Sequence, residues 1–440
     1  MVTNARHPRQ IFISESLGRA ADRRQMLKPA LSAGLILPDM PVSSPDDGPH
    51  DLLTDQAALT PGRGEELRIE PLVAEGDRVA QGQPVAHLRA APEVALVAPM
   101  AGRVASILLQ PGRRLVQMVL FREGDDRHRF DISGQGPDAL AGLMRRSGLW
   151  RALRSRPFGR MPRADETPAA IFVMAIDSRP AAPDPLIALQ GRHEDFQRGL
   201  AALATLTPHL YLCGGVGLAL PGGVRRIRCG ALHPQGLAGI QIHRHHPARI
   251  EAPVWDIHAE DVAALGALLA DGMLPPTRLV SVTGAALHRA RLLRCQPGAD
   301  LRGLCHDITR PGPHQILAGD RIGGHAAHWL GPRDRQVSVL PRGEGRDRGH
   351  WFNAALRRAA RPLPIIPTAA LDQALGGDIP AAALIRALAS GDSEGAVRLG
   401  ALSLLEEDLA LADYVTGADP TLSSQLRVLL QRIHAEEVPQ

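Results

Sequence analysis

Two stretches decide the fold of this chain: Leu72-Val-Ala-Glu-Gly-Asp-Arg-Val-Ala-Gln-Gly-Gln-Pro-Val85 and Val97-Ala-Pro-Met-Ala-Gly-Arg-Val-Ala-Ser-Ile107. Gly76 and Gly82 supply turn conformations that residues with side chains resist. The valines and the isoleucine that follow the glycines are β-branched, and such residues suit short, half-buried strands. Each stretch therefore predicts turns joined to short strands, and together they predict a β domain over about residues 65–122.

The same two stretches resemble the carrier domains that hold biotin or lipoate. Those domains combine Gly-Asp-x-Val-x-x-Gly-Gln with Ala-Pro-x-x-Gly-x-Val, and this chain has both patterns. A carrier needs a lysine at the tip between the two halves. Here the tip runs from His87 to Val94, and Lys28 is the only lysine in the 440 residues. The resemblance implies a barrel-sandwich hybrid domain, and the missing lysine argues against a biotin- or lipoyl-dependent carrier.

Composition limits the classes of function. A chain of 440 residues is expected to form several domains, and a hydrophobic content of 44% is enough to build their cores. The net charge of +4 is a mild excess that suits an acidic partner or an anionic membrane surface. It is too small and too dispersed to predict nucleic-acid binding. No run of 18 apolar residues is present, so any membrane contact is expected to be peripheral.

The cysteines give no sign of a metal or an iron–sulfur centre. The four are Cys213, Cys229, Cys295 and Cys305, and no two of them form a CxxC pair. Iron–sulfur clusters need grouped thiolates, so none is expected. Reduced thiols are the expectation for a chain of this length with no visible secretory signal.

The sequence pattern predicts a mixed α/β and β fold in five parts. The boundaries are an N-terminal extension at 1–27, a barrel-sandwich hybrid domain at 28–135, an α/β domain at 136–258, a β-grasp module at 259–340, and a connector with a helical C-terminal region at 341–440.

Strands and helices alternate in the predicted α/β domain. Ala170–Ile176 is an apolar run typical of a buried parallel strand, and Glu194–Leu206 carries apolar residues at helical spacing. His209–Cys213 predicts the next strand, so the three form a Rossmann-like βαβ unit. A further helix is predicted over Ala259–Leu269.

The β-grasp module is predicted from strands around one short helix. Arg278–Gly284, Arg291–Cys295, Gln315–Gly324 and Gln336–Leu340 are the strand segments, and Ala299–Leu304 is the expected helix. This arrangement is typical of SLBB-like modules.

The C-terminal region is predicted to be helical. Residues 341–378 are rich in Arg, Pro and Gly and predict a connector. Pro380–Ala389 and Thr421–His434 show helical patterns, the second clearly amphipathic.

Two patterns could bind a ligand. Cys213-Gly-Gly-Val-Gly217 follows a strand and could cradle a phosphate, although a tight loop is the simpler interpretation. His243 and His245 would share a face if they lay on a strand, with His246 beside them; metal binding lacks a third ligand, so paired or surface histidines are favoured.

Three charged or glycine-rich segments have structural and functional interpretations. Arg145–Arg163 holds seven arginines and could bind phosphates, lipid headgroups or an acidic subunit, or be a solvated connector; the two interpretations are equally weighted. Glu406-Glu407-Asp408 favours a helix N-terminus over a sodium site. Gly319–Gly324 favours a turn over catalysis. No grouping of residues predicts a catalytic centre or a metal site.

Seven further motifs stand in an order that resembles one family. They are Gln110–Leu120, Ser147–Gly159, Glu194–Phe196, His233–Gly239, Val254–Ile257, Leu384–Asp392 and Glu406–Leu411. Together with the lysine-less hairpin they resemble the NqrA family, whose members are components of the sodium-translocating NADH:quinone oxidoreductase. The RnfC family is similar more distantly, but it carries cysteine clusters that this chain lacks.

The resemblance implies a peripheral subunit on the cytoplasmic side of the inner membrane that is not catalytic alone. It implies that NADH, FAD or FMN and iron–sulfur centres are held by partner subunits, and that this chain docks on other subunits of the complex, especially a membrane flavin subunit. Ubiquinone would be the substrate of the complex, reduced with electrons from NADH while Na+ is exported, and a quinone association near this subunit is implied.

Two stretches depart from the family pattern. Tyr414–Asp419 stands where the family has a Cys-Pro-Gly-Lys feature, and only Thr368–Asp372 matches a Gly-Asn-Tyr-Glu-like stretch. These departures support an alternative: a stand-alone ligand-binding or adaptor protein on the same scaffold, outside any pump.

Overall fold

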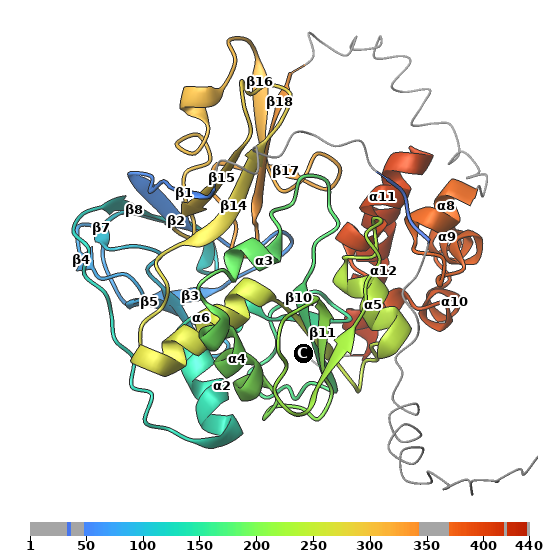
Figure 1. The fold of residues 1–440 in the computed structure, drawn as a ribbon, viewed down its shortest axis with the longest axis horizontal. Coiled ribbons are helices and arrows are strands. Elements are labelled where there is room, and N and C mark those ends of the chain that lie inside the picture. The colour runs from blue at the N-terminus through green and yellow to red at the C-terminus, as the bar shows by residue number, and fades with distance from the viewer. Residues whose placement is uncertain (1–32, 37–47, 343–368, 418–419, 438–440) are drawn as a thin grey trace, which may run out of the picture.

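The computed structural model describes residues 33–36, 48–342, 369–417 and 420–437, and these form four parts packed against one another (Figure 1). The predicted extension at 1–27 and most of the predicted connector lie outside the described residues.

The barrel-sandwich hybrid domain consists of two small sheets. One has the strand order β2-β8-β7-β4 and the other β3-β5-β6. The strands are β2 (Gln56–Leu59), β3 (Ile69–Pro71), β4 (Arg78–Val79), β5 (Pro84–Leu88), β6 (Ala95–Val97), β7 (Gly102–Gln110) and β8 (Arg114–Arg122). Gly102 lies so close to β8 that any side chain would strike the carbonyl of Phe121. The structure confirms the domain that the glycine and valine pattern predicts.

The α/β domain is built on a five-stranded sheet with the order β12-β11-β10-β13-β9. Four strands are parallel, and β9 pairs antiparallel at one edge. The strands are β9 (Arg154–Arg156), β10 (Ala170–Ala175), β11 (Leu210–Gly214), β12 (Val224–Ile227) and β13 (Val254–His258), and the helices are α2 (Gly136–Arg146), α3 (Pro185–Ala188), α4 (His193–Leu203), α5 (Ala238–His245) and α6 (Ala259–Asp271). Every residue of β10 is buried, so the predicted βαβ unit is confirmed as β10-α4-β11.

Helices α4 and α6 cross at unusually short range because two glycines lie in the contact. A side-chain atom on Gly199 would strike the carbonyl of Val262, and one on Gly266 would strike the carbonyl of Asp195. The sequence pattern places α6 in the following module, but in the structure it packs on α4 and on β10 and β13. It therefore belongs to the layer that covers the α/β sheet.

The third part is a six-stranded sheet with the order β1-β15-β14-β18-β16-β17. Its strands are β1 (His50–Asp51), β14 (Arg278–Thr283), β15 (Arg291–Cys295), β16 (His314–Ala318), β17 (His325–Ala326) and β18 (Gln336–Pro341). The central strands β14 and β18 are parallel, while β14–β15 and β16–β18 are antiparallel, as in a β-grasp sheet. The β-grasp topology is confirmed.

The helix predicted over residues 299–304 is wrong. Ala299 and Asp300 instead form bridges with Ala57 and Trp329, and the chain turns before a short 3-10 helix, η2 (His306–Ile308). The Asp300 carboxylate accepts hydrogen bonds from the backbone of Arg302 and Gly303, which stabilises the turn. Contacts with the barrel-sandwich domain thus override a weak local helical preference.

The C-terminal part consists of helices around their own apolar core. They are α8 (Ala369–Ala374), α9 (Ala381–Ser390), α10 (Ser393–Arg398), η3 (Ala401–Ser403), α11 (Glu406–Thr416) and α12 (Leu422–Glu437). The core also takes in Leu237 and Ile240 beside and on α5, which joins it to the α/β domain (Figure 1). The two helices predicted here are confirmed as α9 and α12. Among the described residues, no helix combines the length and apolar character needed to cross a bilayer.

The close crossing of α4 and α6 gives a first prediction. Replacing Gly266 by Ala should lower the free energy of unfolding by about 1–3 kcal/mol, because the methyl group must push the helices apart. This loss should exceed the gain of up to about 1 kcal/mol that alanine brings to an isolated helix. Urea denaturation followed by circular dichroism measures it.

Gly222→Ala is the matched control, because nothing lies within 4 Å of a side-chain atom added there. It should change stability by less than about 0.5 kcal/mol. Equal effects of the two substitutions would show that the helix crossing tolerates a methyl group.

Candidate functional site

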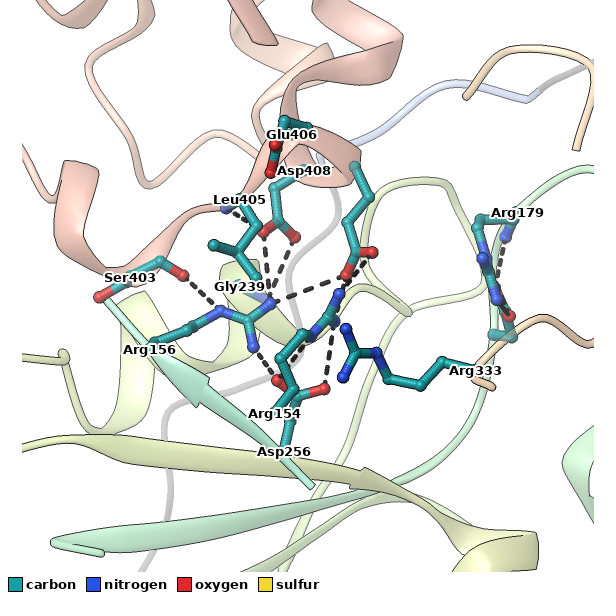
Figure 2. Close-up of polar contacts among 12 residues, drawn as sticks. Arg154, Arg156, Arg179, Gly239, Asp256, Arg333, Ser403, Leu405, Glu406 and Asp408 are labelled. Carbon is teal, nitrogen blue, oxygen red and sulfur yellow. Dashed lines mark hydrogen bonds and ion pairs between the residues drawn. The ribbon is translucent and has the colours of Figure 1, made fainter. Parts of the chain in front are cut away.

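A buried ion network joins the edge of the α/β sheet to the first turn of α11 (Figure 2). Arg154 and Arg156 alternate on the edge strand β9, so both side chains leave the same face of that strand. The pairing of β9 with β13 sets Arg154 opposite Asp256. Helix α11 begins at Glu406, which places Glu407 and Asp408 in its first turn.

Arg154 bridges the two elements. Its guanidinium donates to both carboxylate oxygens of Asp256, at 3.3 Å from Nε and 3.1 Å from Nη2. It also donates to both oxygens of Glu407, at 2.8 Å from Nη1 to Oε2 and by a second bond from Nη2 to Oε1. This paired geometry is the strongest that a guanidinium makes with carboxylates.

Arg156 is the more deeply buried of the two arginines, with none of its side chain exposed. It donates from Nη1 to Asp256, from Nε to the carbonyl of Ser403 at 2.9 Å, and lies 3.5 Å from Asp408. Asp408 in turn accepts from the backbone amide of Leu405 at 2.8 Å and of Gly239 at 3.2 Å. A buried charge is tolerated only with such a full set of partners.

Three carboxylates share two guanidinium groups in this network, and the imbalance falls on Asp408. Burial, with the neighbouring charge of Glu407, raises the pKa of Asp408 to about 6, although Arg156 acts to lower it. Burial acts to raise the pKa of Glu407, but the charge and hydrogen bonds of Arg154 outweigh it and hold that pKa well below its ordinary value. Of Glu407 and Asp408, Asp408 is therefore the carboxyl that takes up a proton first.

The structure divides the segment Arg145–Arg163 between several roles. Arg156 and Arg154 are buried in the ion network, and Arg145 lies over the ring of Trp150. Only part of the segment is solvated, with Arg163 65% exposed. The interpretation as a solvated connector is therefore wrong for the buried arginines, and the interpretation as a binding surface stays a prediction.

A polar cavity of about 390 Å³ opens beside the network, where all four parts of the molecule meet. Arg154, Arg179, His233 and Glu407 are among its lining residues. Asp177 pairs with Arg179 at 3.0 Å, and Ser178 Oγ lies 3.0 Å from His233 Nδ1. These two arginines and the glutamate are paired with neighbouring charges, whereas Arg63, which also lines the cavity, donates to the backbone carbonyl of Gly323.

A second, mainly apolar cavity of about 140 Å³ lies between the barrel-sandwich, α/β and β-grasp parts. Its apolar wall includes Leu59, Val97, Leu149, Leu274, Pro275 and Leu330. A cavity of this volume holds one benzene-sized ring. It lies where three domains meet, a common place for ligand sites.

Three arginines, Arg151, Arg192 and Arg278, also line the apolar cavity. Arg151 donates to the carbonyl of Thr60 at 2.8 Å, and Arg278 donates to the carbonyl of Pro332 at 2.6 Å. The Nε group of Arg278 and one terminal nitrogen of Arg192 are buried without a hydrogen-bond partner. Burial lowers the pKa of both Arg151 and Arg278. Apolar walls with spare N–H donors suit a ring that carries acceptor oxygens.

The other predicted site residues do not come together. Cys213–Gly217 forms a tight loop with positive φ at Gly214, Gly215 and Gly217, and no helix follows it to hold a phosphate. His243 and His245 lie on helix α5, so the premise of a strand is wrong and they do not share a face. Across the described residues, no group of three or more His, Cys, Asp or Glu side chains is placed to hold a metal.

The two remaining segments have the predicted structural roles. Glu406–Asp408 begins a helix, as the acidic pattern predicts, and Gly319–Gly324 forms a turn in which the Asp320 carboxylate accepts from the amides of Ile322 and Gly323. Sequence reasoning misses Arg154, Arg156 and Asp256 as a unit. The alternation of Arg154 and Arg156 is the available signal, but nothing in the sequence pairs it with Asp256, about 100 positions away, or with Glu407 and Asp408, about 250 positions away.

Comparisons with known proteins point to one family. The model of the NqrA N-terminal barrel-sandwich hybrid domain matches residues 46–123, and that of the NqrA second alpha/beta domain matches residues 137–274. The NqrA component of the Na(+)-translocating NADH-quinone reductase of Pseudomonas aeruginosa (strain UCBPP-PA14) is 33% identical over 83% of this chain and 90% of the relative. The same-named protein of Neisseria meningitidis serogroup C is 33% identical over 89% of this chain and 95% of its own length.

Among solved structures, a chain of an NAD+-reducing NiFe hydrogenase in the air-oxidized state is similar at 14% identity. The match covers 67% of this chain and 63% of that chain, with a TM-score of 0.37.

The ion network gives a second prediction. Arg156→Met should lower the free energy of unfolding by about 3–5 kcal/mol, because it leaves buried carboxylates without their partner. Chemical denaturation of the full chain measures this loss. Arg163→Met removes an exposed pair with Asp165 and should cost less than about 1 kcal/mol. If both variants lose the same stability, the buried network is not a special source of stability.

Asp408 gives a third prediction, on pH. Its pKa of about 6 in the folded chain lies above its ordinary value of 3.8, so between these values the folded state binds more protons than the unfolded state. The contribution of Asp408 to the free energy of unfolding therefore rises as the pH falls from 7 to 5.

Asp408→Asn should remove that rise. Urea denaturation at pH 7 and pH 5 measures the unfolding free energy of each protein. The value for the wild type minus the value for the variant should be larger at pH 5. A difference that is independent of pH would contradict the raised pKa.

Proposed function

The chain belongs to the NqrA family, and on this premise we propose that it works as a peripheral, cytoplasm-facing subunit that helps quinone reach a sodium-translocating NADH:quinone reductase. Membership makes it a subunit of that multi-subunit oxidoreductase complex. The observation that carries the proposal is similarity over almost the whole length of both chains, together with the match of the barrel-sandwich and α/β domains to the family models.

The apolar cavity is the place that best suits a quinone ring. Its volume of about 140 Å³ admits one six-membered ring, and its apolar walls favour the ring over water. The unpartnered nitrogens of Arg192 and Arg278 could donate to a quinone carbonyl oxygen. The cavity lies among three domains, so docking of a partner subunit that shifts one domain would change access to it.

The electron-transfer chemistry belongs, in this proposal, to partner subunits. NADH oxidation, the FAD or FMN groups and the iron–sulfur centres would lie on those subunits, above all on a membrane flavin subunit, and Na+ export would be a property of the complex. This chain would contribute a surface on which the partner subunits dock. The four-part body held by the ion network provides the fixed surface that such a role needs.

Purification of the full chain without its partners tests this division of roles. We expect no bound flavin by absorbance, no iron by elemental analysis and no NADH oxidation. A stoichiometric prosthetic group, or NADH turnover by the isolated chain, would overturn it. A chain that never co-purifies with the other subunits would instead favour a stand-alone adaptor.

A cavity-filling substitution gives a fourth prediction. Ala264 lines the apolar cavity from helix α6, and Ala264→Phe should fill the space that a ring needs. In the assembled complex, kcat/KM for ubiquinone should fall roughly tenfold or more, which corresponds to about 1.4 kcal/mol of lost binding.

Ala270→Phe is the matched control, because Ala270 is exposed on the same helix and does not line the cavity. It should leave ubiquinone reduction unchanged. NADH oxidation with an artificial electron acceptor should be normal in both variants. Normal ubiquinone kinetics in an assembled Ala264→Phe complex would exclude the cavity as the quinone site.

A further inference from the structure

Two cysteines that line neither of these cavities lie side by side at one edge of the α/β sheet. Cys213 is near the end of β11, and the parallel register pairs it with Ile227 of β12. Cys229 follows Ile227 by two residues, so its side chain continues on the face that Cys213 occupies. Both pack in the apolar cluster that includes Ala238 and Ile242.

The two thiols are in contact, and their surroundings differ. Cys213 has no exposed surface, whereas Cys229 is partly exposed and reachable from solvent. The hydrogen bond from Cys213, helped by the backbone amide of Gly214, lowers the pKa of Cys229. Burial, and then the hydrogen bond to Cys229, raises the pKa of Cys213. One thiol is therefore suited to react first and the other to follow.

We propose that Cys213 and Cys229 form a peroxide-reactive pair that closes to a disulfide. The Cys229 thiolate attacks one oxygen of hydrogen peroxide, the O–O bond breaks, and Cys229 becomes a sulfenic acid while hydroxide leaves and takes up the thiol's proton as water. The Cys213 sulfur then attacks the sulfenic sulfur. The S–O bond breaks, and the hydroxyl leaves with the Cys213 proton as a second water. Two thiols and one peroxide thus give one disulfide and two waters.

The other two cysteines lack these features. Burial raises the pKa of Cys295 to about 12, and burial also raises the pKa of Cys305. Both are buried in the β-grasp core, where Cys295 is 0% exposed and Cys305 is 1% exposed. Reactivity toward peroxide follows thiolate character and exposure, so these two thiols are internal controls.

The disulfide would covalently link the carboxyl end of β11 to the segment that follows β12. That end of the sheet carries the loop Gly214–Gly217, whose Val216 side chain is 79% exposed. Arg226 already holds this loop by donating to the carbonyls of Gly215 and Leu218. Oxidation would therefore rigidify an exposed loop without altering the ion network.

Peptide mapping of the full chain tests the proposal. The chain is treated with hydrogen peroxide, its remaining thiols are alkylated, and it is cut with trypsin after arginine. Cys213 falls in peptide 199–225 and Cys229 in peptide 229–244. We expect these two peptides to appear linked, about 2 Da below the sum of the reduced peptides, while Cys295 and Cys305 stay alkylated.

Substitutions separate the two roles. In Cys213→Ser, Cys229 should go on to sulfinic acid because the thiol that traps its sulfenic acid is gone. In Cys229→Ser, Cys213 should stay alkylatable. Cys229 found as sulfinic acid in the wild type with Cys213 still reduced, or all four cysteines oxidised at the same rate, would overturn the proposal; neither result requires a variant to fold.

Discussion

The structure depends on two arginines of one short edge strand. Arg156 has no exposed surface, and with Arg154 it binds Asp256 of the neighbouring strand together with Glu407 and Asp408 of α11 (Figure 2). Charges so deeply buried are tolerated only when every partner is in place, so the helical C-terminal part can dock in one way. The same contacts set one wall of the polar cavity, because Arg154 and Glu407 line it. The ion pairs of the two β9 arginines thus fix how parts that are distant in the sequence pack together.

Both cavities lie at junctions between parts rather than within one of them. The polar cavity is lined by all four parts, and the apolar cavity by three. A partner that pressed on one part would therefore alter the space among several. The barrel-sandwich domain keeps the turns and strands of a carrier but has no lysine at its tip, and it packs against the α/β and β-grasp parts. For example, Arg151 of the α/β domain, in η1 (Leu149–Ala152), donates a hydrogen bond to the carbonyl of Thr60 in the barrel-sandwich domain.

Sequence patterns predict the elements whose cause is local. The fully buried run of β10 and the amphipathic pattern of α12 need no tertiary information. The helix expected over residues 299–304 fails because Ala299 pairs with Ala57 of the barrel-sandwich domain and Asp300 with Trp329 of its own β-grasp part. The histidines of α5 are misplaced on a strand because a short polar run carries little periodicity. The ion network and the cavities could not be predicted, because their members become neighbours only when separate domains pack. Cys213 and Cys229 are a similar case, since strand register rather than sequence spacing brings them together.

Hydrogen exchange, read by mass spectrometry, is the most direct measurement of whether the network holds the four parts as one body. In Arg156→Met, the amides of α8 to α12 should exchange faster as a single cooperative unit, while β7 and β8 of the barrel-sandwich domain keep their wild-type protection. Unchanged protection of α11 in the variant, or an equal loss of protection in every part, would contradict the role given to the network.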